Sequence, residues 1–441
     1  MSLLSHAFST KESWNTLWNR PEQGHKVIDG IRALSISLVI LFHTTGMSIF
    51  MGGGPHLISE MVDKTSIYYA WIWNSHYAVD MFFMISGFLI AGLLFREIDR
   101  TGTIDLKAFY IRRLMRLTPA YLFVLTLLFI AKAPHYEMLW SNLLYVNNFF
   151  PYMDTAITWA WSLAVEEQFY FIFPILLLTV FIKSRFVMWM AGLLIFACLI
   201  RFFIASGDPI LSTMPISAIM HDSEVQNHFM SVIYDNLYTR FGAFICGITV
   251  AYFLHYRKES TIDFLNNSHL GKATVVLAIV AAFMVFNLNS GRSDIDWGYW
   301  PTMLYLACAR NLFCLSFSVV MLAMLVSHPL TRPLEKLLSA NFWYPLAQLS
   351  YSSYLYNGIS VGIVCFAMKQ GMLHFTGSYD YTSVGMVLVS FCFAVPATMA
   401  LSSISYLFIE QPFMRMRDYN RQVSKDKALG GNNASAELPA K

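Results

Sequence analysis

The sequence contains little charge. Only 13% of its 441 residues are Asp, Glu, Lys or Arg, against roughly 25% in soluble globular domains. Hydrophobic residues make up 56% of the chain, and its mean hydropathy is +0.50. A water-soluble fold does not cover its surface with so few charges, so we expect lipid to surround much of the chain. The same composition excludes an intrinsically disordered protein.

Other features that would define a site or a compartment are also lacking. The six cysteines lie in apolar stretches without CxxC or metal-ligand spacing, so they are expected to be packing residues, with no metal site. The net charge is only +3, and no basic stripe alternates with aromatic residues, so no nucleic-acid partner is expected. The first 26 residues are polar and lack an apolar core segment, so we expect no cleavable signal peptide.

Long apolar runs occupy most of the chain. A helix needs about 20 mainly apolar residues to cross a bilayer, and ten segments qualify, which predicts an all-α integral membrane protein. The segment that fits this description least well contains Glu166 and Glu167. The expected spans are 27–50, 70–95, 117–133, 157–182, 186–205, 231–254, 271–289, 302–327, 343–366 and 382–410.

The basic residues between these spans predict the orientation of the chain. With the N-terminus in the cytoplasm, 22 Lys and Arg residues fall in cytoplasmic segments and 4 in external segments. Cytoplasmic loops carry the excess of basic residues in membrane proteins, so both termini are expected there. Residues 1–26 would form a cytoplasmic N-terminal segment and residues 27–413 the membrane domain. Residues 414–441 would form a cytoplasmic tail that is basic and then disordered.

The first span contains two residues that are costly to bury in a membrane, Arg32 and His43. They are eleven residues apart, which is about 16 Å along a helix and close to three full turns, so both point to one side. This spacing suggests a tunnel with a cation at its cytoplasmic mouth and an imidazole deeper in the membrane. Alternatively, Arg32 extends to the interface and His43 binds a backbone carbonyl.

Carboxylates and arginines recur near the ends of the next spans. Asp80, near the external end of the second span, either is a solvated helix-end acid or faces His43 and orients it. Ser86 and Gly87 in the same span permit close helix contact. Arg113 and Arg116, beside Arg112, share a helix face and suit phosphate oxygens, although such a cluster taken alone more often anchors a helix at the cytoplasmic surface.

The fourth span places polar residues on one face. Ser162, Glu166 and Tyr170 recur every four residues, whereas Glu167 points elsewhere. Two adjacent glutamates inside a span are poor lipid-facing residues, so one of them is a candidate functional acid. The alternative is a structural ion pair with one of the arginines in the later spans, Arg201, Arg240 or Arg310.

Taken in order, these motifs resemble the membrane acyltransferase-3 family of bacterial O-acyltransferases, over most of residues 27–413. The matching elements are Asp29-Gly30-Ile31-Arg32 with Arg32 and His43 in an R-x10-H motif, Asp80 to Leu89, Arg113 to Pro119, Ser162 to Tyr170, Arg240 with Gly242 and Gly247, Leu349 to Tyr356, and Ile409 to Phe413. Asn357 is a departure, because many members have His there, and this weakens any role of the last helices in proton transfer. Some members also carry an external SGNH esterase-type domain, which is not expected here.

The resemblance implies a reaction and a set of site residues. Acyl-CoA on the cytoplasmic side would be the donor and co-substrate, with no bound cofactor, and acetyl is the default acyl group. The acceptor would be a hydroxyl of a cell-surface or lipid-linked glycan, at the bacterial cytoplasmic (inner) membrane. His43 would be the general base, with Glu166 or Asp80 orienting the imidazole. Arg32, Arg113 and Arg116 would bind CoA phosphates, and the possible supporting residues are Asp29, Ser86, Ser162, Tyr170 and Arg240.

Two other classes of protein fit the buried charges. In a transporter or flippase the same residues would line a permeation path, and in a structural or sensor protein they would join helices together. The three classes differ in what the purified protein does: acyl transfer, flux without covalent change, or neither. The two halves of the chain lack matching interrupted helices, which weakens an inverted-repeat transporter.

Overall fold

The structure is a computed structural model that describes residues 7–22, 24–54, 57–179, 185–295 and 297–417. The secondary structure of these residues is helical, without strands. Ten helices among them are long and apolar enough to cross a membrane. The all-α class and the ten-helix expectation are therefore confirmed for the described part of the chain.

The long helices follow the apolar runs closely. They are α3 (Lys26–Gly52), α6 (Ala78–Thr101), α7 (Leu106–Ile130), α9 (Trp161–Thr179), α10 (Phe186–Gly207), α13 (Leu237–Tyr256), α15 (His269–Phe286), α17 (Arg310–Leu325), α20 (Ser350–Thr376) and α21 (Val384–Ser405). A π-helical turn, Tyr305–Ala309, leads into α17, and another, Tyr406–Glu410, extends α21 towards Arg417.

Several boundaries differ from the sequence expectation, and two of these differences concern helices that line the site. Helix α7 begins at Leu106 rather than at 117, because Asp105 caps it by accepting a hydrogen bond from the backbone N–H of Ala108 (2.9 Å). The arginines expected just before this span therefore lie within the helix. The span expected at 343–366 is divided into the short helix α19 (Trp343–Gln348) and α20.

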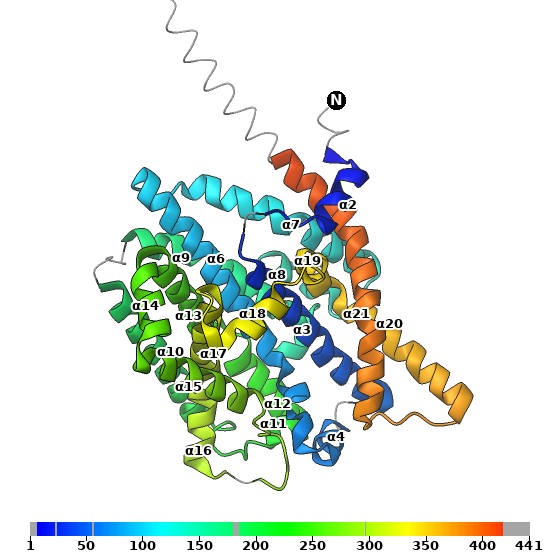
Figure 1. The fold of residues 1–441 in the computed structure, drawn as a ribbon. Coiled ribbons are helices and arrows are strands. Elements are labelled where there is room, and N and C mark those ends of the chain that lie inside the picture. The colour runs from blue at the N-terminus through cyan, green and yellow to red at the C-terminus, as the bar shows by residue number, and fades with distance from the viewer. Residues whose placement is uncertain (1–6, 23, 55–56, 180–184, 296, 418–441) are drawn as a thin grey trace, which may run out of the picture.

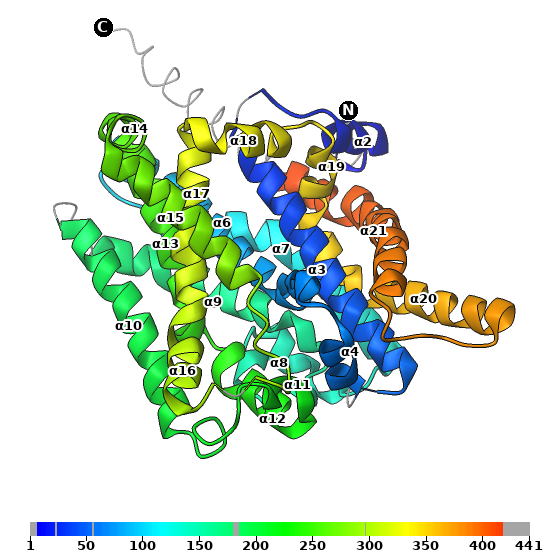
Figure 2. The ribbon, with the colours of Figure 1, turned by 60° about the horizontal axis from the view of Figure 1, so that its bottom comes forward.

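The bundle has two ends, which we call the Lys26 face and the Gly52 face after the ends of α3. Both described ends of the chain lie at the Lys26 face, where α2 (Thr10–Trp18) meets the last helix (Figures 1 and 2). Arg415 there donates to the backbone oxygen of Ser9 (2.9 Å) and pairs with Glu12 (3.5 Å). Short helices that include α4 (Ile58–Lys64), α11 (Ala218–His221), α12 (Ser223–Phe229) and α16 (Tyr299–Leu304) lie towards the Gly52 face (Figure 1).

This arrangement agrees with an even number of spans, while the cytoplasmic assignment of the Lys26 face stays a prediction. The expected tail, residues 414–441, lies outside the described residues from position 418 onwards.

Glycines allow the central helices to approach closely. A Cβ atom on Gly247 of α13 would lie 1.9 Å from the backbone oxygen of Met84 in α6, and one on Gly87 would lie 2.4 Å from that of Phe244. Larger residues at these positions would push the two helices apart. Helix α3 packs against α6, α20 and α21. Residues from α3, α6 and α20 are thereby brought to the middle of the bundle.

Candidate active site

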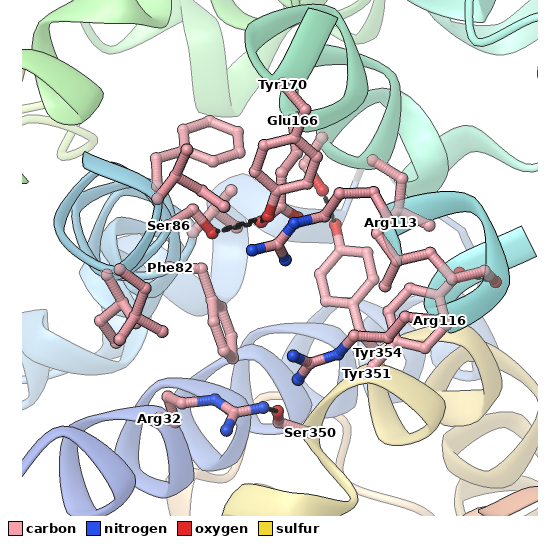
Figure 3. A pocket seen from close by; sticks show the side chains of 18 of the residues that line it. Arg32, Phe82, Ser86, Arg113, Arg116, Glu166, Tyr170, Ser350, Tyr351 and Tyr354 are labelled. Atoms are coloured by element: carbon pink, nitrogen blue, oxygen red, sulfur yellow. Dashed lines mark hydrogen bonds between the residues drawn. The ribbon is translucent and has the colours of Figure 1, made fainter. Parts of the chain in front are cut away.

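A cavity of about 310 Å³ lies between α3, α6, α7, α9 and α20. Figure 3 shows the side chains around it, with apolar and aromatic groups on several sides and polar groups pointing inwards. Its polar and aromatic lining includes Arg32, Phe82, Ser86, Arg96, Arg113, Arg116, Ser162, Glu166, Tyr170, Ser350, Tyr351 and Tyr354. Seven of the residues singled out in the sequence, from four separate helices, therefore share one cavity.

Three arginines converge on this cavity. The guanidinium groups of Arg32 from α3 and of Arg113 and Arg116 from α7 point into the same space (Figure 3). Arg32 donates to the hydroxyl of Ser350 (2.8 Å). Within the described residues, none of the three forms an ion pair with a carboxylate. The cavity therefore carries an excess of positive charge, which suits phosphate oxygens.

The neighbouring arginine has a different environment. Arg112 pairs with Glu97 (3.6 Å) and does not line the cavity. Arg113 instead lies over the ring of Tyr170, 5.0 Å from its centroid. The helical spacing thus correctly separated the face of Arg113 and Arg116 from Arg112.

Glu166 forms a compact group with two hydroxyls on the cavity wall. Ser86 and Tyr170 both donate hydrogen bonds to its Oε1 atom (Figure 3). Ser162, one turn earlier on α9, is hydrogen bonded to the hydroxyl of Tyr354 (2.5 Å). Glu167 lines a different, largely apolar cavity, so the two glutamates point in different directions, as their spacing predicts.

His43 lies just beyond the cavity, towards the Gly52 face. Its ring centroid is 6.5 Å from that of Trp159. The backbone oxygen of Trp159 accepts a hydrogen bond from the hydroxyl of Tyr354 (2.8 Å), which lines the cavity. The imidazole is thus separated from the arginine-lined space by one layer of side chains.

Asn357 determines how the imidazole is held. Its Oδ1 atom is hydrogen bonded to Nδ1 of His43, while its Nδ2 atom donates to the backbone oxygen of Tyr354 (2.5 Å). Because the amide nitrogen is engaged there, the amide oxygen faces the ring and must accept a proton from Nδ1. A neutral His43 then has its lone pair on Nε2, the form that a general base requires.

The expectation that Asp80 or Glu166 would orient the imidazole is wrong. Asp80 is 1% exposed, and its carboxylate accepts from Arg240 (2.9 and 3.1 Å) and Arg310 (2.5 Å). A buried carboxylate requires such strong partners because it has lost its hydration. Glu166 bonds Ser86 and Tyr170 instead of His43. The ion pair with an arginine of a later span, which was the alternative for the glutamates, is formed by Asp80 instead.

Asp29 lies away from the cavity. Its Oδ2 atom accepts from Nε and Nη2 of Arg20 (3.0 and 2.7 Å), and Arg20 also donates to the backbone oxygens of Ser339 and Lys26. This contact ties the N-terminal segment to the Lys26 face. Asp29 therefore has a structural contact with Arg20 and does not line the site.

Sequence reasoning missed two participants in this arrangement. Asn357 was noted only as a departure from the resemblance, and it contacts the candidate base directly. Arg310 was noted only as one of several arginines within spans, and it completes the pairing of Asp80. Neither contact has a local signal, because the partners are 314 and 230 residues apart in sequence.

The protein is therefore a bundle of long apolar helices with an internal cavity lined by arginine side chains. Comparison with known families agrees with the motif resemblance: the acyltransferase domain family Acyl_transf_3 matches residues 25–407. The chain belongs to this family, and the matched domain covers most of its length.

Several relatives have names that refer to O-acetylation. The chain is 26% identical over 418 residues to a provisionally named O-acetyltransferase, SACOL0978, of Staphylococcus aureus (strain COL), covering 88% of this chain and 57% of the relative. It is 25% identical over 416 residues to the O-acetyltransferase OatA of Staphylococcus aureus (strain NCTC 8325 / PS 47), with the same coverage.

A further relative comes from an animal. The chain is 25% identical over 456 residues to nose resistant to fluoxetine protein 6 of Caenorhabditis elegans, covering 92% of this chain and 52% of that protein. The chain thus spans little more than half the length of these relatives. No solved structure matches it significantly.

Proposed function

We propose that the protein is an integral membrane O-acyltransferase of the bacterial cytoplasmic membrane. It transfers an acyl group, acetyl by default, from cytoplasmic acyl-CoA to a hydroxyl of a cell-surface or lipid-linked glycan. The observation that carries this proposal is that three arginines without a carboxylate partner among the described residues line one cavity, and that a histidine with an available Nε2 atom lies just beyond that cavity.

The donor enters from the Lys26 face. Arg32, Arg113 and Arg116 bind the phosphates of CoA, where guanidinium groups form charge-assisted and often bidentate hydrogen bonds. The flexible pantetheine arm then extends between the apolar and aromatic walls towards Ser162 and Tyr354. This places the thioester close to the layer that contains Trp159, and hence close to His43.

The acceptor approaches His43 from the Gly52 face. Nε2 removes the proton of the acceptor hydroxyl as its oxygen attacks the thioester carbonyl. The C–O bond forms, the C–S bond breaks, and the imidazolium returns the proton to the departing CoA thiolate. A positioned base typically contributes about 10²–10⁴-fold to such a step. Asn357 keeps the ring in the required tautomer, while Glu166 fixes Ser86 and Tyr170 beside the donor.

Proteoliposomes of one orientation test both the reaction and its sidedness. Radiolabelled acetyl-CoA is supplied only at the Lys26 face, and a water-soluble acceptor glycan only at the Gly52 face. Acylated glycan at the Gly52 face, with free CoA at the other, is the expected result. Product only when both substrates share the Lys26 face would overturn transfer across the membrane. Glycan flux without any covalent change would favour the transporter alternative.

A further inference from the structure

A second cavity, of about 90 Å³, lies closer to the Gly52 face than the arginine-lined cavity does. Phe42 lies between this second cavity and the candidate base, with its ring centroid 5.8 Å from that of His43 and 5.9 Å from that of His76. Its polar lining comes from Asn74, His76, Tyr77, Arg201, Gln226, Tyr234, Ser290, Tyr305 and Arg310. The second cavity therefore lies on the Gly52-face side of His43, the side from which the acceptor would arrive.

The described residues that line the second cavity include two guanidinium groups and no carboxylate. Arg310 shares Asp80 with Arg240, so two cations are bound to one buried anion. Within the part of the chain that the structure describes, Arg201 donates to neutral backbone oxygens alone, those of Leu306, Ile233 and Thr239. Among the described residues, Asp80 is thus the one carboxylate that binds guanidinium groups of this cluster directly.

The other buried carboxylate nearby does not remove this excess. Asp235 is 3% exposed and is not a lining residue, and its Oδ1 atom has no hydrogen-bond partner among the described residues. Even with Asp80 and Asp235 both ionised, the three buried arginines leave one positive charge in excess. An unbalanced charge away from water is costly unless a ligand supplies the opposite charge.

Groups suited to a saccharide surround this charge. The Nδ1 atom of His76 is buried and has no hydrogen-bond partner in the described part of the chain. The ring of His76 packs edge-on against Tyr77 and Tyr234, at centroid distances of 4.7 and 5.9 Å. Gln226 adds an amide from α12. The cavity volume exceeds that of one water severalfold, which accommodates a substituent of a sugar rather than a whole ring.

We propose that the second cavity binds an anionic group, a carboxylate or a phosphate, carried by the acceptor saccharide. The inference rests on the proposed function for the identity of the acceptor. Arg201 and Arg310 supply the charge, and His76 and Gln226 supply hydrogen bonds to adjacent oxygens. The saccharide then extends past Phe42, so that one of its hydroxyls approaches Nε2 of His43. The cavity thereby selects acidic saccharides over neutral ones.

A binding assay tests this without requiring acyl transfer. The full chain, purified in detergent, is unfolded thermally with glucuronate, glucose 6-phosphate or glucose at matched ionic strength. A ligand that binds only the native state raises the Tm by mass action. We expect a saturable increase with glucuronate, glucose 6-phosphate or both, and none with glucose. Equal responses to all three sugars, or no response to either anionic sugar, would overturn the proposal.

Substitutions in and outside the second cavity show whether the rise in Tm comes from a sugar bound there. Ile219 lines the second cavity from α11 and is not part of the charge cluster, so Ile219→Trp fills the cavity without removing a buried charge. Ile210→Trp is the matched control, because Ile210 is 40% exposed and does not line the cavity. Ile219→Trp and Arg310→Gln should each raise the half-saturating concentration of the responding sugar at least tenfold, a free-energy change of about 1.4 kcal/mol, whereas Ile210→Trp should not.

Arg113→Gln shows whether the anionic sugar binds in the first cavity or in the second, because the first cavity is also basic. A response that disappears in Arg113→Gln but persists in Ile219→Trp would assign the anion to the first cavity and refute the inference. If Arg310→Gln fails to fold, Ile219→Trp still decides the outcome. The assay is also independent of the proposed reaction. Absence of acyl transfer would refute the proposed function and leave a localised anion response standing, and the reverse result would refute only this inference.

Discussion

The amide oxygen of Asn357 is hydrogen bonded to Nδ1 of His43, so a residue of α20 fixes the ring of a residue of α3. The amide itself is held by the backbone of Tyr354 (2.5 Å). In this chain a neutral amide occupies the place that a carboxylate takes in many catalytic histidine pairs. It selects the tautomer without adding a charge next to the imidazole.

Asn357→Leu should therefore lower kcat, because the imidazole loses the acceptor that keeps the proton on Nδ1. A reduction of about 10²-fold is expected, within the usual contribution of a positioned base. Asn357→Asp retains an acceptor for Nδ1 and should preserve more activity than Asn357→Leu. Steady-state kinetics of the two variants measure both effects. Equal activity in the Leu variant and the wild type would contradict this role.

The two adjacent glutamates provide a matched pair. Glu166→Gln replaces an acceptor of two hydroxyl hydrogen bonds with an amide, which should release Ser86 and Tyr170 and lower kcat at least about tenfold, since each bond to a charged group contributes about 1.5–3 kcal/mol. Glu167→Gln changes a residue outside the first cavity and should have a much smaller effect. The reverse order of the two activities would refute the assignment of Glu166.

Arginine geometry is tested by lysine substitution. Arg113→Lys combined with Arg116→Lys keeps the charge but removes the planar, bidentate donors. The apparent Kd for acyl-CoA should rise about tenfold or more, measured by calorimetry on the purified protein. Arg112→Lys is the control, because Arg112 pairs with Glu97 outside the cavity. Unchanged CoA binding in the double variant would show that Arg113 and Arg116 serve only as an anchor.

The buried ion pairs of Asp80 predict a stability effect rather than a loss of base function. Asp80→Asn leaves the guanidinium groups of Arg240 and Arg310 without their anion, which should cost about 3–5 kcal/mol of unfolding free energy. Asp294→Asn, at an exposed pair with Arg292, should leave the Tm unchanged. Thermal unfolding in detergent compares the two variants. If Asp80→Asn is as stable as the wild type, the pairing is not structural.

Local spacing explains why much of the site was predictable. Residues three, four or eleven apart on one helix share a face whatever the rest of the fold does, so the grouping of Ser162, Glu166 and Tyr170 followed from the sequence. The same reasoning placed Arg113 and Arg116 together and turned Glu167 away. The apolar runs likewise predicted the ten long helices, because bilayer thickness sets their length.

Contacts between helices were not predictable in this way. The pairing of Asp80 with Arg240 depends on how closely α6 and α13 approach, which Gly87 and Gly247 determine. Sequence spacing left His43 as a possible partner of Asp80 for the same reason. The start of α7 was misplaced because its first turns are basic and fall outside an apolar window, although Asp105 is a recognisable helix cap.

His43→Ala, assayed for acyl transfer and CoA binding in the same preparation, tests the central claim most directly. The matched control is His269→Ala, at an exposed histidine that begins α15. The account predicts that His43→Ala inserts, folds and binds acyl-CoA with unchanged affinity, while acyl transfer to the acceptor falls by about 10²–10⁴-fold, the contribution of a positioned base. Acyl transfer by His43→Ala at the rate of the His269→Ala control would contradict it.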